Sequence, residues 1–172
     1  MLQMLGIVLV IGSCTALGLS ARQRLVRRVR ALTQFLRAFD LILTEMRANQ
    51  TPLPQLIDRL CGEELGEVRR FFVSLQKRMQ RQSEFSFSHH WQAAARDLAE
   101  PLGLGREEVE ALRHAALYLG RYQAEQQIDG LQYTRAQLEG ICKEARQALQ
   151  TKGNLYRTCG IAAGVALVLM ML

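Results

Sequence analysis

The chain has 172 residues, of which 22 are lysine or arginine and 16 are aspartate or glutamate, so its formal net charge is +6. This length supplies one modest core and leaves no room for a second domain. Five arginines account for most of the excess charge, and the remaining 17 basic and 16 acidic residues nearly cancel. These five are Arg22, Arg24, Arg27, Arg28 and Arg30. The charge is therefore local, and it does not predict a surface that binds nucleic acid.

The uncharged run ahead of these arginines predicts a transmembrane helix over residues 1–21. As a helix it would span roughly 32 Å, slightly more than the hydrocarbon core of a bilayer. Arginines directly behind a span stay in the cytoplasm, so the five arginines predict a membrane-surface anchor there. A cleaved signal peptide is disfavoured, because only the amino group precedes the apolar run. Ile11-Gly12-Ser13-Cys14 resembles a lipobox, but the uncharged run continues to Ala21 and the charge bias is reversed. Lipidation at Cys14 is therefore disfavoured as well.

Beyond the arginines, apolar residues recur at alternating spacings of four and three, which predicts that the first helix continues to Ala48. These residues are Leu25, Val29, Leu32, Leu36, Phe39, Leu43 and Met46. Asn49-Gln50 is predicted to end this helix. Thr51 and Pro52 are predicted to begin the next one, as N-cap and first residue. Its expected inner face is Leu53, Leu56, Ile57 and Leu60, and Gly62 is expected to end it.

A third helix is predicted from about Glu63 to Gln82. Its acidic start and its basic end would suit the helix dipole. Five of its charged residues, Glu63, Glu64, Glu67, Arg69 and Arg70, are also a candidate partner interface, although a solvated surface is the default interpretation of such charges.

A fourth helix is predicted from about Phe87, with Ser86 or Ser88 as its cap and with Pro101 and two glycines at its end. A fifth is predicted over 106–119, with Glu107 and Glu108 in its first turn, where the dipole favours acids. Gly120 is expected to close this helix or to bend the chain.

The last helix is predicted from about Gln123, where positions spaced by four and three are apolar apart from Arg135. It runs into Arg157 and a second uncharged segment, 158–172, which would span roughly 22 Å. With Leu155 and Tyr156 added, and with Arg157 extending to the membrane surface as a second anchor, this segment reaches about 27 Å. The sequence thus predicts an all-α protein: a cytoplasmic bundle of about six helices over 22–157, flanked by transmembrane helices at 1–21 and 158–172.

No pattern predicts catalysis, a cofactor, a metal site or a small-molecule substrate. His89 and His90 are adjacent, so on a helix they point about 100° apart and cannot share one metal. His114 lies on another helix, and capping or surface positions explain all three histidines. The four cysteines show no C-x-x-C spacing and are expected to be small apolar side chains. Gly103-Leu104-Gly105 follows a proline instead of a strand, so it does not predict a phosphate-binding loop.

The architecture resembles the stage III sporulation protein AB family of endospore-forming bacteria. The resemblance rests on the apolar start, the arginines, the long helix, Thr51-Pro52-Leu53, and Leu117-Tyr118-Leu119-Gly120 leading into Gln126-Gln127. After Gly120 this chain has Arg121-Tyr122, where the family usually has a small residue and an acid.

The resemblance implies a component of the channel complex between mother cell and forespore, in the mother-cell membrane around the forespore. It also implies a helical domain similar to the cytoplasmic domain of type II secretion and type IV pilus platform proteins, with a secretion-type ATPase, the sister protein AA, as partner. The sequence leaves a second class open, a membrane-tethered helical adaptor or sensor. A gene for the ATPase in the same operon would favour the first class, and a gene for a kinase or regulator the second.

Overall fold

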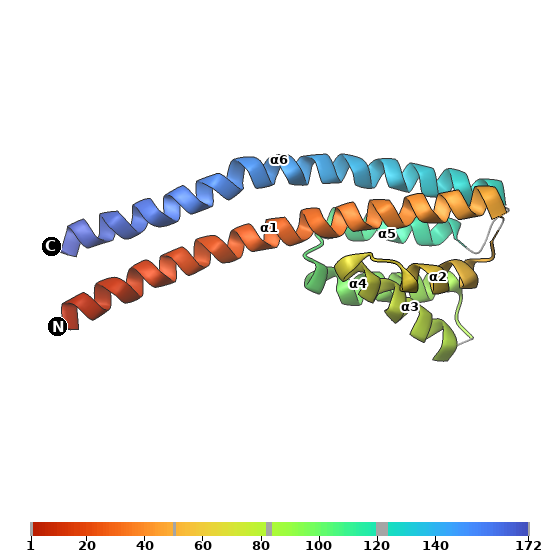
Figure 1. Cartoon of the computed structure of the whole chain (residues 1–172), viewed down its shortest axis with the longest axis horizontal. Helices are drawn as coiled ribbons and strands as arrows, with labels where there is room; N and C mark the ends of the chain where they lie inside the picture. The colour runs from red at the N-terminus through yellow and green to blue at the C-terminus, as the bar shows by residue number, and fades with distance from the viewer. Residues whose placement is uncertain (1, 50, 82–83, 120–123, 172) are drawn as a thin grey trace. The chain divides into compact units, whose positions relative to one another are not determined.

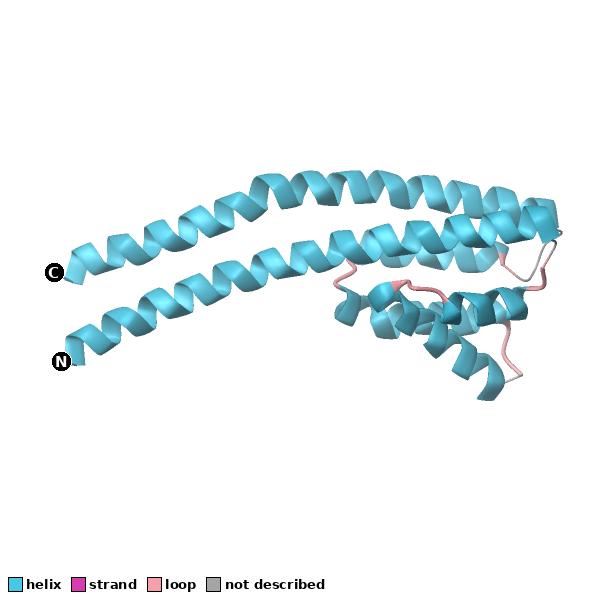
Figure 2. Cartoon of the chain, in the orientation of Figure 1, coloured by secondary structure: helices cyan, strands magenta, loops and turns pink. Residues whose placement is uncertain are grey.

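The computed structural model describes residues 2–49, 51–81, 84–119 and 124–171, except for the side chains of 2–18, 124 and 152–171. Every regular element in these ranges is a helix (Figure 2). In chain order they are α1 (Leu2–Asn49), α2 (Leu53–Gly62), the short 3-10 helix η1 (Gly66–Val68), α3 (Arg69–Arg81), α4 (Phe87–Leu102), α5 (Arg106–Tyr118) and α6 (Ala124–Met171) (Figure 1). The prediction of an all-α fold is confirmed.

The chain divides into two compact units. One is Arg30–Lys143, which contains α2 to α5 together with the inner parts of α1 and α6. The other is made of the two outer stretches, Met1–Val29 and Glu144–Leu172. The helical bundle and the two terminal segments are therefore separate structural units that share two long helices.

The transmembrane helices predicted for 1–21 and 158–172 fall largely on residues whose side chains the structure does not describe. The backbone there is helical as far as it is described, since α1 and α6 each have 48 residues. Among the residues whose side chains the structure describes, no helix is long and apolar enough to cross a bilayer. Both spans stay predictions.

The core of the bundle is an aromatic cluster centred on Trp91 of α4, whose side chain is fully buried. Its ring lies 4.9 Å from that of Phe71 in α3 and 6.3 Å from that of Phe39 in α1, both edge to face. Its indole Nε1 donates a hydrogen bond of 2.9 Å to the carbonyl of Leu112 in α5. Edge-to-face pairs stabilise beyond their buried area, and a buried indole N–H needs a partner. Trp91 thus connects four helices of the bundle.

The small helices pack in chain order, α2 against α3, α3 against α4 and α4 against α5. The predicted inner face of α2 is largely confirmed, because Leu56, Ile57 and Leu60 are buried, whereas Leu53 is half-buried. On α6 the buried residues include Leu131, Leu138, Cys142 and Ala145, as the spacing of four and three predicts. The amphipathic pattern therefore identified the packed faces of these helices.

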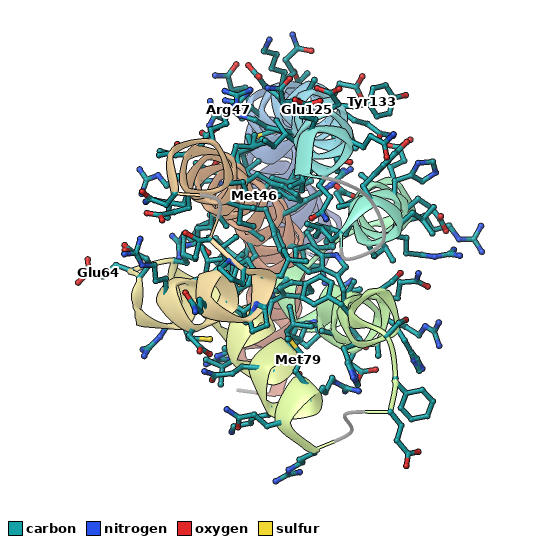
Figure 3. All side chains as sticks on the ribbon, turned by 90° about the vertical axis from the view of Figure 1, so that its right-hand side faces the viewer. Met46, Arg47, Glu64, Met79, Glu125 and Tyr133 are labelled. Carbon is teal, nitrogen blue, oxygen red and sulfur yellow. The ribbon has the colours of Figure 1, made fainter. Side chains whose placement is uncertain are left out.

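The start of the third helix was predicted wrongly. Glu63 and Glu64 follow α2 as exposed, non-helical residues, and Figure 3 shows Glu64 projecting away from the bundle. The chain turns at Gly66, which has φ +54°, a conformation that favours glycine. The N–H of Val68 donates to Oε1 of Gln34 in α1, at 3.2 Å. A side chain 34 positions earlier thus helps to hold the turn ahead of α3.

Two other helix ends differ from the prediction by a few residues. The N-cap of α2 is Pro52, and the helix begins at Leu53, one residue later than predicted. Thr51, the predicted N-cap, instead donates its hydroxyl hydrogen to Oε2 of Glu45 at 3.3 Å. Pro101 lies inside the last turn of α4, and the helix ends with Gly103 at φ +69°. The Ser86 cap of α4 is confirmed, because its hydroxyl accepts from the N–H of His89.

Candidate partner-binding surface

Three of the five predicted interface residues line two different grooves. Glu63 lines a groove between α1 and α2, and Arg69 and Arg70 line another along α3. Glu64 is exposed in the loop between them, and Glu67 is half-buried in η1. The acidic and basic members of the set therefore do not form one mixed patch.

The groove along α3, called here the basic groove, has a volume of about 690 Å³. Five of its eight lining residues are cationic, and the other three are small or aliphatic. The eight are Gly66, Arg69, Arg70, Val73, Ser74, Lys77, Arg78 and Arg81. Residues 70, 77 and 81 are seven and four positions apart, so one face of the helix carries all three. The sequence contains this spacing, and it could have indicated the groove. From the sequence, the basic end of the helix is instead assigned to the helix dipole alone.

Two of the five cations are held by bonds within the protein. Arg69 Nε donates to the carbonyl oxygen of Cys61 at the end of α2, at 2.6 Å. Arg78 pairs with Asp97 of α4. Arg70, Lys77 and Arg81 are exposed, and among the described residues the structure gives them no carboxylate partner.

The second groove, between α1 and α2, is smaller and more apolar, with a volume of about 320 Å³. Leu41, Ile42, Leu56 and Leu60 contribute its apolar lining. At its edge Arg59 pairs with Glu45.

Several groups act on the Glu45 carboxylate. A hydrogen bond of 3.0 Å from Asn49 is the largest influence holding the pKa of Glu45 below its ordinary value. Arg59 and Thr51 act in the same direction, while burial opposes them. Glu45 thus connects the end of α1 to α2 as an anion.

Four of the predicted membrane anchors lie on the outer part of α1, and Arg30 begins its inner part. Arg22, Arg24, Arg27 and Arg30 have exposed side chains and Arg28 is half-buried. The side chain of Arg157 and all of Gly120 lie outside the described residues, so the structure does not test those two predictions.

The three histidines and the first-turn acid Glu108 of α5 differ in burial. His89 and His114 are exposed, as predicted, but His90 is buried at 4% exposure because its side of α4 faces the bundle, which corrects the surface or capping role. Glu108, in the first turn of α5, is fully buried, so its side chain does not face solvent. No group of three or more His, Cys, Asp or Glu side chains suited to a metal ion occurs in the described part of the chain.

The two cysteines with described side chains are both free thiols. Burial, with a contribution from Asp58, raises the pKa of the Cys61 thiol. Cys142 is buried, with its sulfur 3.9 Å from the Thr33 hydroxyl. Cys61 is therefore protonated at neutral pH, which agrees with the small apolar role predicted for it.

Comparison with known proteins gives a consistent result. The family model described as stage III sporulation protein AB (spore_III_AB) matches residues 3–172. The chain is 22% identical to the stage III sporulation protein AB of Bacillus subtilis (strain 168) over 172 residues, covering 100% of both chains. A solved structure of stage III sporulation protein AB (SpoIIIAB) is similar in fold, with a TM-score of 0.65 at 20% identity, covering 72% of this chain and 97% of that one.

Proposed function

Since the chain belongs to the stage III sporulation protein AB family, we propose that it is a structural subunit of a sporulation channel complex, without catalytic activity of its own. It is anchored by its two ends in the mother-cell membrane around the forespore. Its helical bundle lies in the cytoplasm and docks a secretion-type ATPase, the sister protein AA.

The observation that supports this function is the continuity of α1 and α6. Each is a single helix of 48 residues that begins or ends in an apolar terminal segment and also contributes to the bundle core. A helix that runs from an apolar terminal segment directly into the bundle suits a subunit that docks its partner at a membrane. The exposed grooves on α1 to α3 offer surfaces to that partner.

The direct test is binding of the ATPase to the full chain, purified in an uncharged detergent. We expect the two proteins to co-purify, and we expect sporulation to fail when residues 1–21 are deleted. A proline at Leu36, in the interior of α1, should have the same effect, because proline there costs about 3 kcal/mol. Normal sporulation without residues 1–21, or a failure of the purified proteins to bind, would contradict the proposal.

Topology gives an independent check. A reporter that is active only in the cytoplasm, inserted between residues 82 and 86, should be active. Labelling of this site from outside the cell would overturn both the orientation and the docking of a cytoplasmic ATPase.

A further inference from the structure

The first turn of α3 carries two cations and follows directly on η1, which contains Glu67. Arg69 and Arg70 stand there, and the turn contains no acid. The N-terminal end of a helix favours anions and disfavours cations. Arg69 is compensated by its bond to the Cys61 carbonyl, but Arg70 is exposed and no such bond to it is seen among the described residues. Helix stability therefore does not explain Arg70.

Arg70 shares a face of α3 with Lys77 and Arg81, and all three line the basic groove. On either side of them, Arg69 is fixed toward α2 and Arg78 toward α4. Arg70, Lys77 and Arg81 thus form a row of cations to which the described residues give no carboxylate partner, and Arg69 and Arg78 on either side of the row are held by bonds to neighbouring helices. From Arg70 to Arg81 the row is roughly 17 Å long, which matches about five residues of an extended chain.

We propose that the basic groove binds an acidic segment of a partner protein. The groove proposal rests on the proposed function in one respect, because the secretion-type ATPase would supply the acidic segment. Carboxylates of that segment would pair with Arg70, Lys77 and Arg81, and its aliphatic carbons would contact Val73. The groove has the dimensions of a short peptide and presents both the charge and the apolar contact that such a segment needs.

Two other anionic partners fit the groove less well. Single-stranded nucleic acid is held by aromatic side chains on which its bases stack, and none of the residues lining the groove is aromatic. A face that lies on a membrane carries large exposed apolar residues beside its cations, and here the one aliphatic side chain, Val73, is half-buried. The groove therefore favours a protein segment.

The test uses the full chain in nanodiscs of an uncharged lipid and two ligands, the purified ATPase and an oligo-glutamate peptide. The variant carries Arg70→Glu, Lys77→Glu and Arg81→Glu. The matched control carries Arg37→Glu, Arg96→Glu and Arg106→Glu, three other exposed arginines, so both change the net charge equally. We expect the groove variant to bind both ligands at least about tenfold more weakly, and the control to bind them as the unmodified chain does.

The outcomes separate this proposal from the proposed function. If the unmodified chain binds the ATPase and the groove variant binds it equally well, the groove proposal fails and the proposed function stands. If the chain binds oligo-glutamate through the groove but does not bind the ATPase, the proposed function fails and the groove still recognises an acidic segment. Tighter groove-dependent binding of an oligonucleotide, or of phosphatidylglycerol vesicles, than of oligo-glutamate would overturn the choice of a protein partner.

A folding defect is excluded by a second variant with alanine at the same three positions. It should retain the circular dichroism spectrum of the unmodified chain and still lose binding, and retention of full binding would contradict the proposal. Binding by the unmodified chain should also weaken as salt is raised, because exposed charges are screened.

Discussion

Arg135 of α6 donates to both carboxylate oxygens of Asp40 in α1, through Nε at 2.5 Å and through Nη2 at 3.5 Å. The hydrogen bond to Asp40 is the largest influence raising the pKa of Arg135. Arg135 is the polar residue that interrupts the apolar spacing of the last helix, and this pair explains it. The pair is thus a charged contact between α1 and α6, the two long helices of the bundle.

We expect Asp40→Ala and Arg135→Ala each to lower the free energy of unfolding of a fragment covering residues 25–155. This fragment contains the whole compact unit that holds the bundle. Both side chains are partly exposed, at 53% and 34%, so the coupling energy should be about 0.5–1 kcal/mol. A double-mutant cycle by urea denaturation measures it. Arg113→Ala, which breaks the pair within α5, is the control and should cost less.

Gly66 should not tolerate a side chain. Its φ of +54° disfavours alanine by about 1–2 kcal/mol, and a Cβ there would lie 2.2 Å from Nε2 of Gln34. Gly66→Ala should therefore lower the urea midpoint of the fragment clearly. It should also weaken the bond from Val68 to Gln34 that holds the turn before α3.

Gly140 in α6 is the matched control for Gly66. A Cβ there meets nothing within 4 Å, and alanine favours a helix over glycine, so Gly140→Ala should stabilise by about 0.5–1 kcal/mol. Equal effects of the two substitutions would contradict the assigned turn at Gly66.

Glu45 should make the bundle sensitive to acid. Its pKa is lowered in the folded protein below the ordinary value of 4.5, so its contribution to stability is present above that pH and is lost as the pH falls through the folded value. Glu45→Gln should be less stable than the unmodified fragment at neutral pH. The difference between their urea midpoints should shrink below pH 4.5, and a constant difference would contradict the assignment.

The three histidines should separate by burial. His90→Ala should destabilise the fragment by about 1–3 kcal/mol, because a large buried side chain is removed. His89→Ala and His114→Ala, at exposed positions, should change the unfolding free energy by less than about 0.5 kcal/mol and leave sporulation intact. Loss of sporulation in either exposed variant, with folding unchanged, would count against a purely structural subunit.

Helix content and packed faces could be predicted because both depend on neighbouring residues. Apolar residues spaced by four and three lie on one side of any helix, so the buried faces of α2 and α6 followed from the spacing. The serine cap at Ser86 and the stop at Gly62 followed from local backbone chemistry.

The misplaced features depended on contacts with distant residues. Glu63 and Glu64 would suit a helix start in isolation, but the chain turns instead at Gly66, beneath the side chain of Gln34. Burial of His90 and Glu108 likewise depends on which elements cover them, and spacing along one helix does not contain that information.

The sequence by itself determined the all-helical fold, the amphipathic faces and the resemblance to the sporulation family, because each depends on residue types at short separations. Only the tertiary structure decided that Arg135 meets Asp40, 95 positions away. It also decided that Arg69 and Arg78 are bonded, whereas the other cations of the basic groove are exposed, namely Arg70, Lys77 and Arg81. The physical reason is that a cation on a helix has the same local pattern whether or not a neighbouring helix supplies its acceptor. That acceptor is placed by packing.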